Sequence, residues 1–463
     1  MDISFTSFGF MEKVARGKKM KKVTVIGAGM MTGPLARYLL DKCGYYVTMV
    51  DQVISRSLKI IGDRPKGKAV EICVTDSYKL DTVIKEADVV LSMVPKPVHP
   101  HVAKSCLRNG KSMLTTSYET PELLALSDEA RAKRILILNE IGEDPGIDHL
   151  GTMMLLDNIR KDGGKVMGLK SFGSGLPSFK FNSNPIGYKF SWDPRTLFTA
   201  SQAPAAYYEK GKRIDILGKK LFECFYYVDI EDLGTFETYP NKDCRKYLEH
   251  FGLAPETASF YRGLLRYPGY CNFMRYLINL GLFDNEKVED FTGKTYLQLT
   301  ASLVGSDNNA SIEEKIARFL HINKFADFIH RYKWLGLMDD RQIRIKKGTR
   351  QDVLLDRMLE KMSYKPYGRD MIIVHIEAMA EFPGNKKEKR TATMIARGIP
   401  YGDSAMSRAV GLPIAIAAKL FLEGKINAVG THMPPTLPHL YSAILEELAE
   451  FGFSFTNKTM PCE

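Results

Sequence analysis

Short β-branched apolar runs alternate with amphipathic stretches of helical periodicity over roughly the first third of the chain. The first two apolar runs are Val23–Ile26 and Tyr46–Val50, with a helical stretch between them. Further runs of the same kind occur at residues 68–74, 88–94, 112–116 and 135–138. Continuous apolar strands separated by helices are typical of a parallel sheet covered by helices on both faces. The pattern therefore predicts an α/β domain over residues 21–143.

A glycine-rich turn joins the first predicted strand to the first predicted helix. It reads Gly27-Ala-Gly29-Met30-Met31-Thr32-Gly33, so the third glycine of the usual G-x-G-x-x-G pattern is replaced by threonine. Gly27 permits the tight turn, and Gly29 lets a pyrophosphate approach the backbone at the helix N-terminus. The second strand ends in Asp51, where a carboxylate can accept hydrogen bonds from the adenosine ribose. We interpret residues 21–143 as a Rossmann-type dinucleotide-binding domain; the alternative is a βαβ unit that binds nothing.

Two residues bear on which dinucleotide would bind. Asp51 would repel a 2′-phosphate, which favours NAD, whereas Arg56 could neutralise that phosphate and leaves NADP possible. Met30 and Met31 flank the pyrophosphate position in this interpretation. Val94 and Pro95 end a later strand, where the nicotinamide half should lie.

The remainder of the chain predicts further units around this domain. Residues 144–243 and 364–402 mix strands and loops and are expected to form an α/β substrate domain. Residues 244–363 carry helical periodicity and are expected to be an all-helical insertion. Residues 403–463 begin with a long helix and are expected to pack back on the first domain, and residues 1–20 are expected to be a flexible tail.

Composition narrows the possible partners. The formal net charge is +11, but the surplus comes from three short segments, residues 1–22, 341–350 and 386–390. The last of these is expected in a hairpin loop between two strands. Isolated basic segments favour solvated surface over a nucleic-acid footprint, and no uninterrupted apolar run is long enough to suggest a membrane span, so neither partner is expected. Seven cysteines without a C-x-x-C pair predict reduced thiols in a cytoplasmic protein without a metal site.

Beyond the first domain, a series of unusual motifs resembles the saccharopine dehydrogenase family, specifically its L-glutamate-forming type. The resemblance runs from about residue 21 almost to the C-terminus. The motifs are Ser117–Tyr118, Asn139–His149, Gly175–Pro177, Asn184–Trp192, Tyr239–Asp243, Arg262–Tyr267, Gly281–Phe283, Gly402–Ser407 and Gly424–Asn427.

The resemblance implies an NAD(P)-linked oxidoreductase of lysine metabolism. Saccharopine would be oxidised at the lysine-side C–N bond and hydrolysed to L-glutamate and 2-aminoadipate 6-semialdehyde. A small-molecule substrate and a homodimer are implied. The resemblance suggests a catalytic role for Asp144 and a place for Trp192 in the cofactor or substrate pocket. The substrate contacts that it implies are Ser117, Tyr118, Asp144, Lys242, Leu264, Leu265 and Arg266.

Two departures and two alternatives accompany this resemblance. Lys242 stands where relatives typically carry an arginine that binds a substrate carboxylate, and Phe172–Gly175 replaces a segment that often holds a cysteine. Lysine keeps the charge but loses the planar fork. The alternatives are a related enzyme that joins an amine and an aldehyde reductively, such as carboxynorspermidine dehydrogenase, and a dinucleotide-binding regulatory protein without catalysis.

Overall fold

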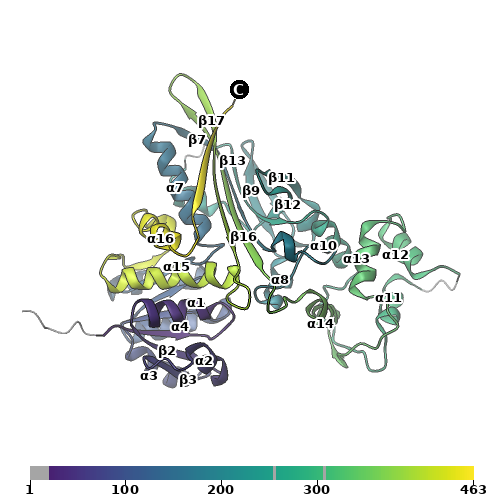
Figure 1. Cartoon of the computed structure of the whole chain (residues 1–463), viewed down its shortest axis with the longest axis horizontal. Helices are drawn as coiled ribbons and strands as arrows, with labels where there is room; N and C mark the ends of the chain where they lie inside the picture. Colours follow the sequence, from purple (N-terminus) through teal and green to yellow (C-terminus); the bar gives the residue numbers. More distant parts are fainter. Residues whose placement is uncertain (1–19, 254–256, 306–308, 463) are drawn as a thin grey trace, which may run out of the picture.

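The computed structural model describes residues 20–253, 257–305 and 309–462. The predicted tail, residues 1–20, lies outside these ranges except for Met20. The fold is α/β, as predicted, with two large sheets and a helical unit at one end (Figure 1).

The first sheet is parallel throughout, in the order β18-β6-β5-β4-β1-β2-β3. Its strands are β1 (Lys22–Ile26), β2 (Tyr46–Asp51), β3 (Gly67–Glu71), β4 (Val89–Ser92), β5 (Ser112–Thr115), β6 (Leu136–Leu138) and β18 (Gly430–His432). The connecting helices are α1 (Thr32–Arg37), α2 (Ile54–Ile61), α3 (Ser77–Lys85), α4 (His99–Arg108), α5 (Pro121–Leu124) and α6 (Ser127–Ala132). The reversal of strand order beside β1 puts the glycine-rich turn at the switch point of a doubly wound sheet, where ligands of such folds bind.

The second sheet is mixed, and its main path runs β10-β9-β13-β7-β16-β17-β19. Its strands are β7 (Lys165–Gly173), β8 (Gly175–Pro177), β9 (Ala205–Glu209), β10 (Lys212–Ile216), β11 (Tyr226–Ile230), β12 (Gly234–Pro240), β13 (Ser259–Arg266), β16 (Asp370–Phe382), β17 (Lys386–Arg397) and β19 (Phe455–Cys462). The long β16–β17 hairpin projects upward in Figure 1, with α7 (Ile147–Lys161) beside it. The short helices α8 (Pro194–Ala200) and α9 (Lys246–His250) occur in its connections.

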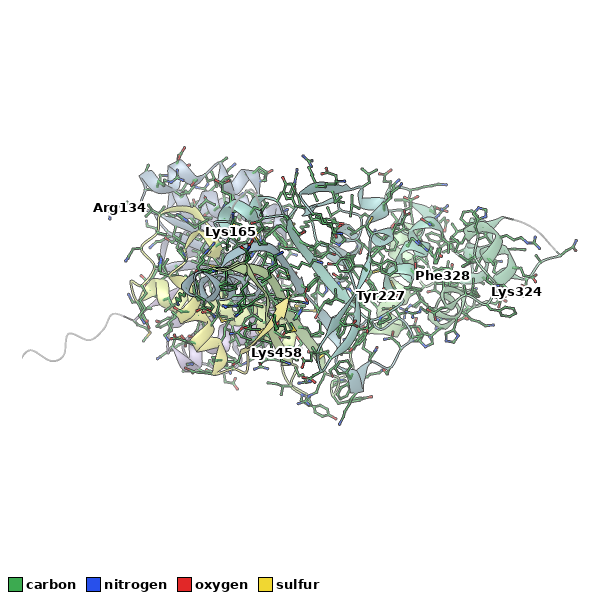
Figure 2. The ribbon with its side chains drawn as sticks, turned by 90° about the horizontal axis from the view of Figure 1, so that it is seen from above. Arg134, Lys165, Tyr227, Lys324, Phe328 and Lys458 are labelled. Atoms are coloured by element: carbon green, nitrogen blue, oxygen red, sulfur yellow. The ribbon has the colours of Figure 1, made fainter. Side chains whose placement is uncertain are left out.

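The helical unit packs on an apolar core that it shares with α8 and with strands β9, β10 and β12, and it forms the end of the molecule opposite the first domain. It contains α10 (Tyr270–Asn279), α11 (Tyr296–Val304), α12 (Ile312–Leu320), α13 (Asp327–Leu335) and α14 (Arg350–Met362), with a small ribbon of β14 (Glu289–Asp290) and β15 (Lys347–Gly348). Figure 2 shows Phe328 and Lys324 at this end and Arg134 at the other.

Three predicted boundaries are wrong. Residues 244–363 are not all helical, because β13 lies among them and pairs in parallel with β7 inside the second sheet. Residues 403–463 do not all return to the first domain, because β19 pairs with β17 along the second sheet. The basic run at 386–390 belongs to β17 rather than to the hairpin loop. On this strand Arg390 pairs with Glu388 and with Asp162.

The helix α15 (Ala405–Leu422) packs on α1 and connects the two sheets, while α16 (Leu440–Ala449) packs beside it and α7. Gly411 allows the close approach, since a Cβ there would lie 2.7 Å from the carbonyl oxygen of Met31. By length and hydropathy α15 could cross a membrane, yet 72% of that window is buried within the protein, and core helices meet the same criteria.

Candidate active site between the two sheets

The glycine-rich turn leaves room for a ligand at its second glycine. Gly27 has a φ of +101°, and a Cβ there would lie 2.6 Å from the carbonyl oxygen of Met93. Apart from its chain neighbours, no atom of the described residues lies within 4 Å of a Cβ built on Gly29, so its surroundings there are open. The Thr32 hydroxyl donates to the Gly29 carbonyl at 2.7 Å, which closes the turn in place of the missing third glycine. These features fit a pyrophosphate at this turn, with Met30 exposed beside it and Met31 at the N-cap of α1.

Asp51 is occupied by the turn itself. One carboxylate oxygen accepts the backbone N–H of Ala28 at 2.8 Å, and the other accepts the N–H of Val53 at the same distance. Arg56 Nη1 lies 3.8 Å from Asp51 Oδ1, and 58% of the Arg56 side chain is exposed. The cation therefore stands beside the position of the adenosine ribose, and the carboxylate is already partly compensated.

A buried histidine that the sequence analysis missed holds Ser117. His99 Nε2 lies 2.7 Å from the Ser117 Oγ, and His99 Nδ1 lies 2.8 Å from the Ser92 Oγ. Burial lowers the pKa of His99 to about 4, with a smaller effect from Lys96, so the ring is neutral near pH 7. This network ties Ser117, which follows β5, to Ser92 at the end of β4, and Val94 and the exposed Pro95 follow that strand.

The segment that leaves β6 brings Asp144 between the two sheets. Its carboxylate accepts hydrogen bonds from the Tyr118 hydroxyl at 2.9 Å and from the Asn241 amide at 3.2 and 3.3 Å. Gly173 of β7 backs this carboxylate, and a Cβ there would lie 2.5 Å from Asp144 Oδ2. The structure thus brings Tyr118 and Asp144 together and adds Asn241 to them.

Arg262 on β13 compensates the buried acids of this segment. It donates to Asp144 Oδ1 at 2.7 Å and also bonds Asp148 Oδ2, and all three side chains are no more than 6% exposed. Burial raises the pKa of Asp144 against the lowering effect of Arg262. Burial would also raise the pKa of Asp148, but Arg262 and His149 bring it below its usual value. We refer to Asp144, Asp148 and Arg262 as the ion cluster.

A second set of contacts ties the same segment to α9. Buried Glu140 accepts hydrogen bonds from the Tyr247 hydroxyl at 2.7 Å and from Lys246 at 3.0 Å, and lies 2.9 Å from His149 Nε2. Glu140 adopts a φ of +59°, a strained conformation that persists only when neighbouring contacts hold it. These contacts fix the segment between the sheets from its other side.

Arg266 occupies an aromatic enclosure on the same face of β13 as Arg262. Its guanidinium carbon lies 5.3–5.5 Å from the ring centroids of Tyr188, Tyr239 and Tyr270. Its terminal nitrogens donate to the Leu265 carbonyl and the Tyr239 hydroxyl, and its Nε has no hydrogen-bond partner among the described residues. Within the described parts of the chain no carboxylate pairs with Arg266, although it is 3% exposed. A buried cation without a counter-ion favours an anionic ligand.

The other residues predicted to line the site near Arg266 do not all lie on its side of the strand. Leu264 shares its face of the strand, because side chains alternate along β13. The side chain of Leu265 points to the opposite face and packs with Phe172 and Phe236 in the core, so a contact of this residue with substrate would have to come from its backbone. Trp192 donates to the Tyr188 hydroxyl at 2.9 Å and is thereby linked to the enclosure.

Lys242 is half-buried beside Tyr118. Its Nζ stands 3.5 Å from the centroid of the Tyr118 ring. It has a φ of +60°. Burial, followed by the charge of Lys96, lowers its pKa to about 7.

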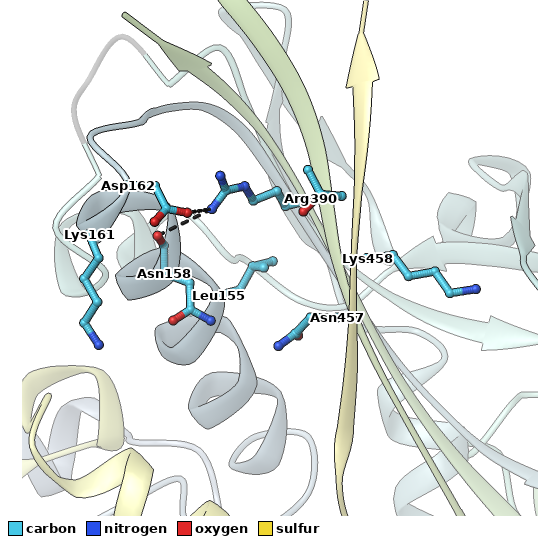
Figure 3. A pocket seen from close by; sticks show the side chains of 8 residues that line it. Leu155, Asn158, Lys161, Asp162, Arg390, Asn457 and Lys458 are labelled. Atoms are coloured by element: carbon cyan, nitrogen blue, oxygen red, sulfur yellow. Dashed lines mark hydrogen bonds and ion pairs between the residues drawn. The ribbon is translucent and has the colours of Figure 1, made fainter.

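A separate cavity of about 280 Å³ lies between α7 and the strands β17 and β19, lined by Asn158 and Arg390 among others (Figure 3). None of the predicted site residues lines that cavity.

Two protein-family models match this chain, one over each large part of the fold. The model of the saccharopine dehydrogenase NADP binding domain matches residues 23–138, and that of the saccharopine dehydrogenase C-terminal domain matches residues 142–453. The chain belongs to the saccharopine dehydrogenase family. This membership confirms the resemblance drawn from the sequence motifs.

Individual members of the saccharopine dehydrogenase family cover nearly the whole chain. Saccharopine dehydrogenase [NADP(+), L-glutamate-forming] of Schizosaccharomyces pombe is 30% identical over 94% of this chain and 98% of its own length. The Saccharomyces cerevisiae enzyme of the same name is 32% identical over 95% of this chain and 99% of its own. Mitochondrial alpha-aminoadipic semialdehyde synthase of Bos taurus is 31% identical, with 49% of its length covered. The apo structure of the L-Glu forming saccharopine dehydrogenase from S. cerevisiae superposes with a TM-score of 0.85 at 30% identity, covering 95% of this chain and 100% of that one.

The comparisons correct the predicted preference for NAD. The matching domain model is an NADP binding domain, and both yeast relatives carry NADP(+) in their names. The reasoning from Asp51 failed because its carboxylate is bound by the N–H groups of Ala28 and Val53 and lies beside Arg56. The carboxylate of Asp51 at the end of β2 is therefore already bound and does not by itself exclude a 2′-phosphate.

Replacing Arg262 with methionine should destabilise the protein strongly. The R262M variant leaves the carboxylates of Asp144 and Asp148 buried without their cation, and breaking such a pair costs about 3–5 kcal/mol. The difference from the parent protein should shrink as the pH falls from 7 toward 4. In R262M burial without the cation raises the pKa of both acids, so the folded variant takes up protons before the unfolded chain does and regains stability over this range. In the parent the lowered pKa of Asp148 means that its contribution is lost only at still lower pH. Urea denaturation at several pH values measures both effects.

The matched control is R195M. Arg195 pairs with Asp352 at 3.3 Å at the surface and is 75% exposed, so its loss should cost at most about 1 kcal/mol. Equal losses for R262M and R195M would contradict the assigned role of the ion cluster.

Proposed function

We propose that the chain catalyses the NADP-dependent oxidation of saccharopine at its lysine-side C–N bond, with hydrolysis to L-glutamate and 2-aminoadipate 6-semialdehyde, and the reverse reaction. The observation that carries this proposal is the cluster of Asp144, Tyr118 and Asn241 in a chain that also has a dinucleotide-binding turn. Two cations of this region, Arg266 and Lys242, have no carboxylate partner among the described residues. Family membership and near full-length similarity to enzymes of this name support it.

The charges of the site suit a tricarboxylate. Arg266 is charged in its tyrosine enclosure and can bind one carboxylate of the substrate. Because this cation is buried, an anionic partner is favourable. The Tyr118 hydroxyl, the Asn241 amide and Ser117 add polar groups around Asp144. Asp144 itself can accept a hydrogen bond from the substrate nitrogen and orient it, the catalytic contact predicted for it.

The nicotinamide, when bound, accepts the hydride. Gly27 and Gly29 would hold the pyrophosphate at the α1 N-terminus, and Val94 and Pro95 lie at the strand end nearest Ser117. Trp192 is proposed to line the cofactor or substrate pocket, because it is hydrogen-bonded to Tyr188 beside Arg266. The side chains of Asp144 and Arg262 are no more than 6% exposed, and exclusion of water suits a reacting carbon from which hydride must leave before hydrolysis.

Two further proposals concern the state of the protein in the cell. Seven cysteines without a disulfide among the described residues suit a cytoplasmic protein. The strand β19 forms an exposed edge of the second sheet, and an exposed edge offers a surface for pairing with a second copy, as a homodimer requires.

The proposed reaction has a direct assay. The purified chain, mixed with saccharopine and NADP, should produce absorbance at the wavelength of reduced nicotinamide and release L-glutamate in equal amount. The same assay with NAD should be much slower. Absence of saccharopine-dependent reduction with either cofactor, across neutral and mildly alkaline pH, would refute the proposal.

Removing Arg56 should weaken NADP binding selectively. In the R56A variant a 2′-phosphate would lose its nearest exposed cation, and the loss of one such contact corresponds to about a tenfold higher Kd for NADPH. Affinity for NADH should stay unchanged. Fluorescence titration of both reduced cofactors measures this. K59A, which removes an exposed cation from the same helix, serves as control; equal losses in both variants would count against a specific contact.

A further inference from the structure

His99 connects the ends of two neighbouring strands of the first sheet, and its side chain is 0% exposed. Its Nδ1 lies 2.8 Å from the hydroxyl oxygen of Ser92, the last residue of β4. Its Nε2 lies 2.7 Å from the hydroxyl oxygen of Ser117, which follows β5. The Thr115 hydroxyl stands farther off, 3.5 Å from Nδ1 and 3.4 Å from Nε2. The two short contacts form a continuous chain from Ser92 through His99 to Ser117.

The protons of this chain can be arranged in two ways that keep both short hydrogen bonds. A neutral imidazole has one N–H and one lone pair, and burial keeps this ring neutral near pH 7. In the first arrangement the Ser92 hydroxyl donates to Nδ1, and the Nε2–H donates to the Ser117 oxygen. In the second the Nδ1–H donates to the Ser92 oxygen, and the Ser117 hydroxyl donates to Nε2. The two arrangements differ in which serine proton has no acceptor within the chain.

The surroundings of Ser92 favour the first arrangement. Ser92 is 0% exposed, and among the described residues its hydroxyl has no hydrogen-bond partner except His99. The second arrangement would leave the Ser92 proton buried without an acceptor, which is costly. The first leaves only the proton of Ser117 without an acceptor in the protein, and Ser117 is partly exposed. Thr115 favours neither arrangement, because its hydroxyl is almost equally far from both ring nitrogens.

Resting on the proposed function, we propose that His99 is a positioning residue whose Nε2–H holds the Ser117 oxygen and thereby makes the Ser117 hydroxyl a hydrogen-bond donor to a bound ligand. The neighbouring hydroxyl of Tyr118 is also a donor, to Asp144. A donor at Ser117 requires an acceptor oxygen, either a carboxylate of saccharopine or the carboxamide oxygen of the nicotinamide. It does not suit the substrate ammonium, which has only donors to offer.

The tautomer of His99 tests this arrangement directly and without an activity assay. Two-bond ¹H–¹⁵N correlation spectra of protein labelled with ¹⁵N-histidine distinguish an Nε2–H ring from an Nδ1–H ring. The signal absent from H99N identifies His99, and S117A should shift the same signal. The expected ring at pH 7 is neutral with its proton on Nε2. A neutral ring with its proton on Nδ1, or a doubly protonated ring, would overturn the proposal.

The S117A variant identifies the oxygen that receives the Ser117 proton. Loss of one hydrogen bond to a ligand corresponds to about tenfold weaker binding. A higher Kd for NADPH in fluorescence titration would indicate the carboxamide oxygen, and a higher KM for saccharopine would indicate a substrate carboxylate. A rise in either constant supports the proposal. If both constants stay at the parent values, Ser117 donates to neither ligand and the proposal is wrong.

A double-variant cycle shows whether His99 acts through Ser117. H99N removes the Nε2–H and should weaken the same ligand about fivefold. In the S117A background H99N should add no further loss, because the hydroxyl that it positions is already absent. H99Q, whose amide can donate in place of the Nε2–H, should restore part of the affinity. Losses that multiply in the H99N/S117A double variant would mean that His99 acts independently of Ser117.

The matched control is H101N. His101 also lies on α4, but its ring nitrogen is 3.4 Å from the Ser77 hydroxyl and no contact joins it to Ser117 among the described residues. This variant should leave the NADPH Kd and the saccharopine KM unchanged.

The S92A variant keeps the test decisive if H99N fails to fold. Without the Ser92 hydroxyl the penalty on the Nδ1–H ring disappears, so the His99 signal of S92A should show a larger share of that tautomer. No such increase would contradict the argument from Ser92. If the parent chain fails to oxidise saccharopine, the proposed function falls, while the tautomer and the NADPH titrations still decide the role of His99.

Discussion

The contact of Arg262 with Asp144 and Asp148 is the interaction on which the arrangement between the two sheets depends. Two carboxylates taken out of water need a cation at hydrogen-bond distance, and Arg262 supplies it from β13 while both acids come from the segment and helix that follow β6. The ion cluster therefore joins the second sheet to the exit of the first. Tyr118, Asn241 and Gly173 then converge on Asp144, and Lys242 is positioned over Tyr118. The site has this form because a single buried cation holds both acids in place.

Local parts of the fold could be predicted from the sequence, because their physics is local. The turn at Gly27 and Gly29, the strands beside it and the acid at Asp51 lie within one βαβ unit, where chain order and spatial order coincide. β13 and β19 were missed because their pairing is settled by partners far along the chain, β7 for one and β17 for the other. β13 also interrupts a region whose flanking helices dominate its periodicity.

The site was predicted in part for the same reason. Tyr118, Asp144 and Lys242, which the family motifs carry, lie together in the structure. Arg262 was passed over in favour of Arg266, although both belong to the same motif. Alternation along a strand would have placed Arg262, Leu264 and Arg266 on one face and Leu265 on the other, had the segment been predicted as a strand. The environments of Asp51 and His99 could not be predicted, because backbone N–H groups and hydroxyls from separate loops determine them.

The proposed oxidation takes place at the lysine-side carbon of saccharopine, and isotopic labelling tests this position most directly. Saccharopine carrying deuterium on the methylene carbon next to the secondary nitrogen should transfer one deuterium to the reduced cofactor, seen by mass spectrometry, and give L-glutamate without label. Release of lysine that retains both deuterium atoms, together with unlabelled reduced cofactor, would place the oxidation on the glutarate side and contradict the account.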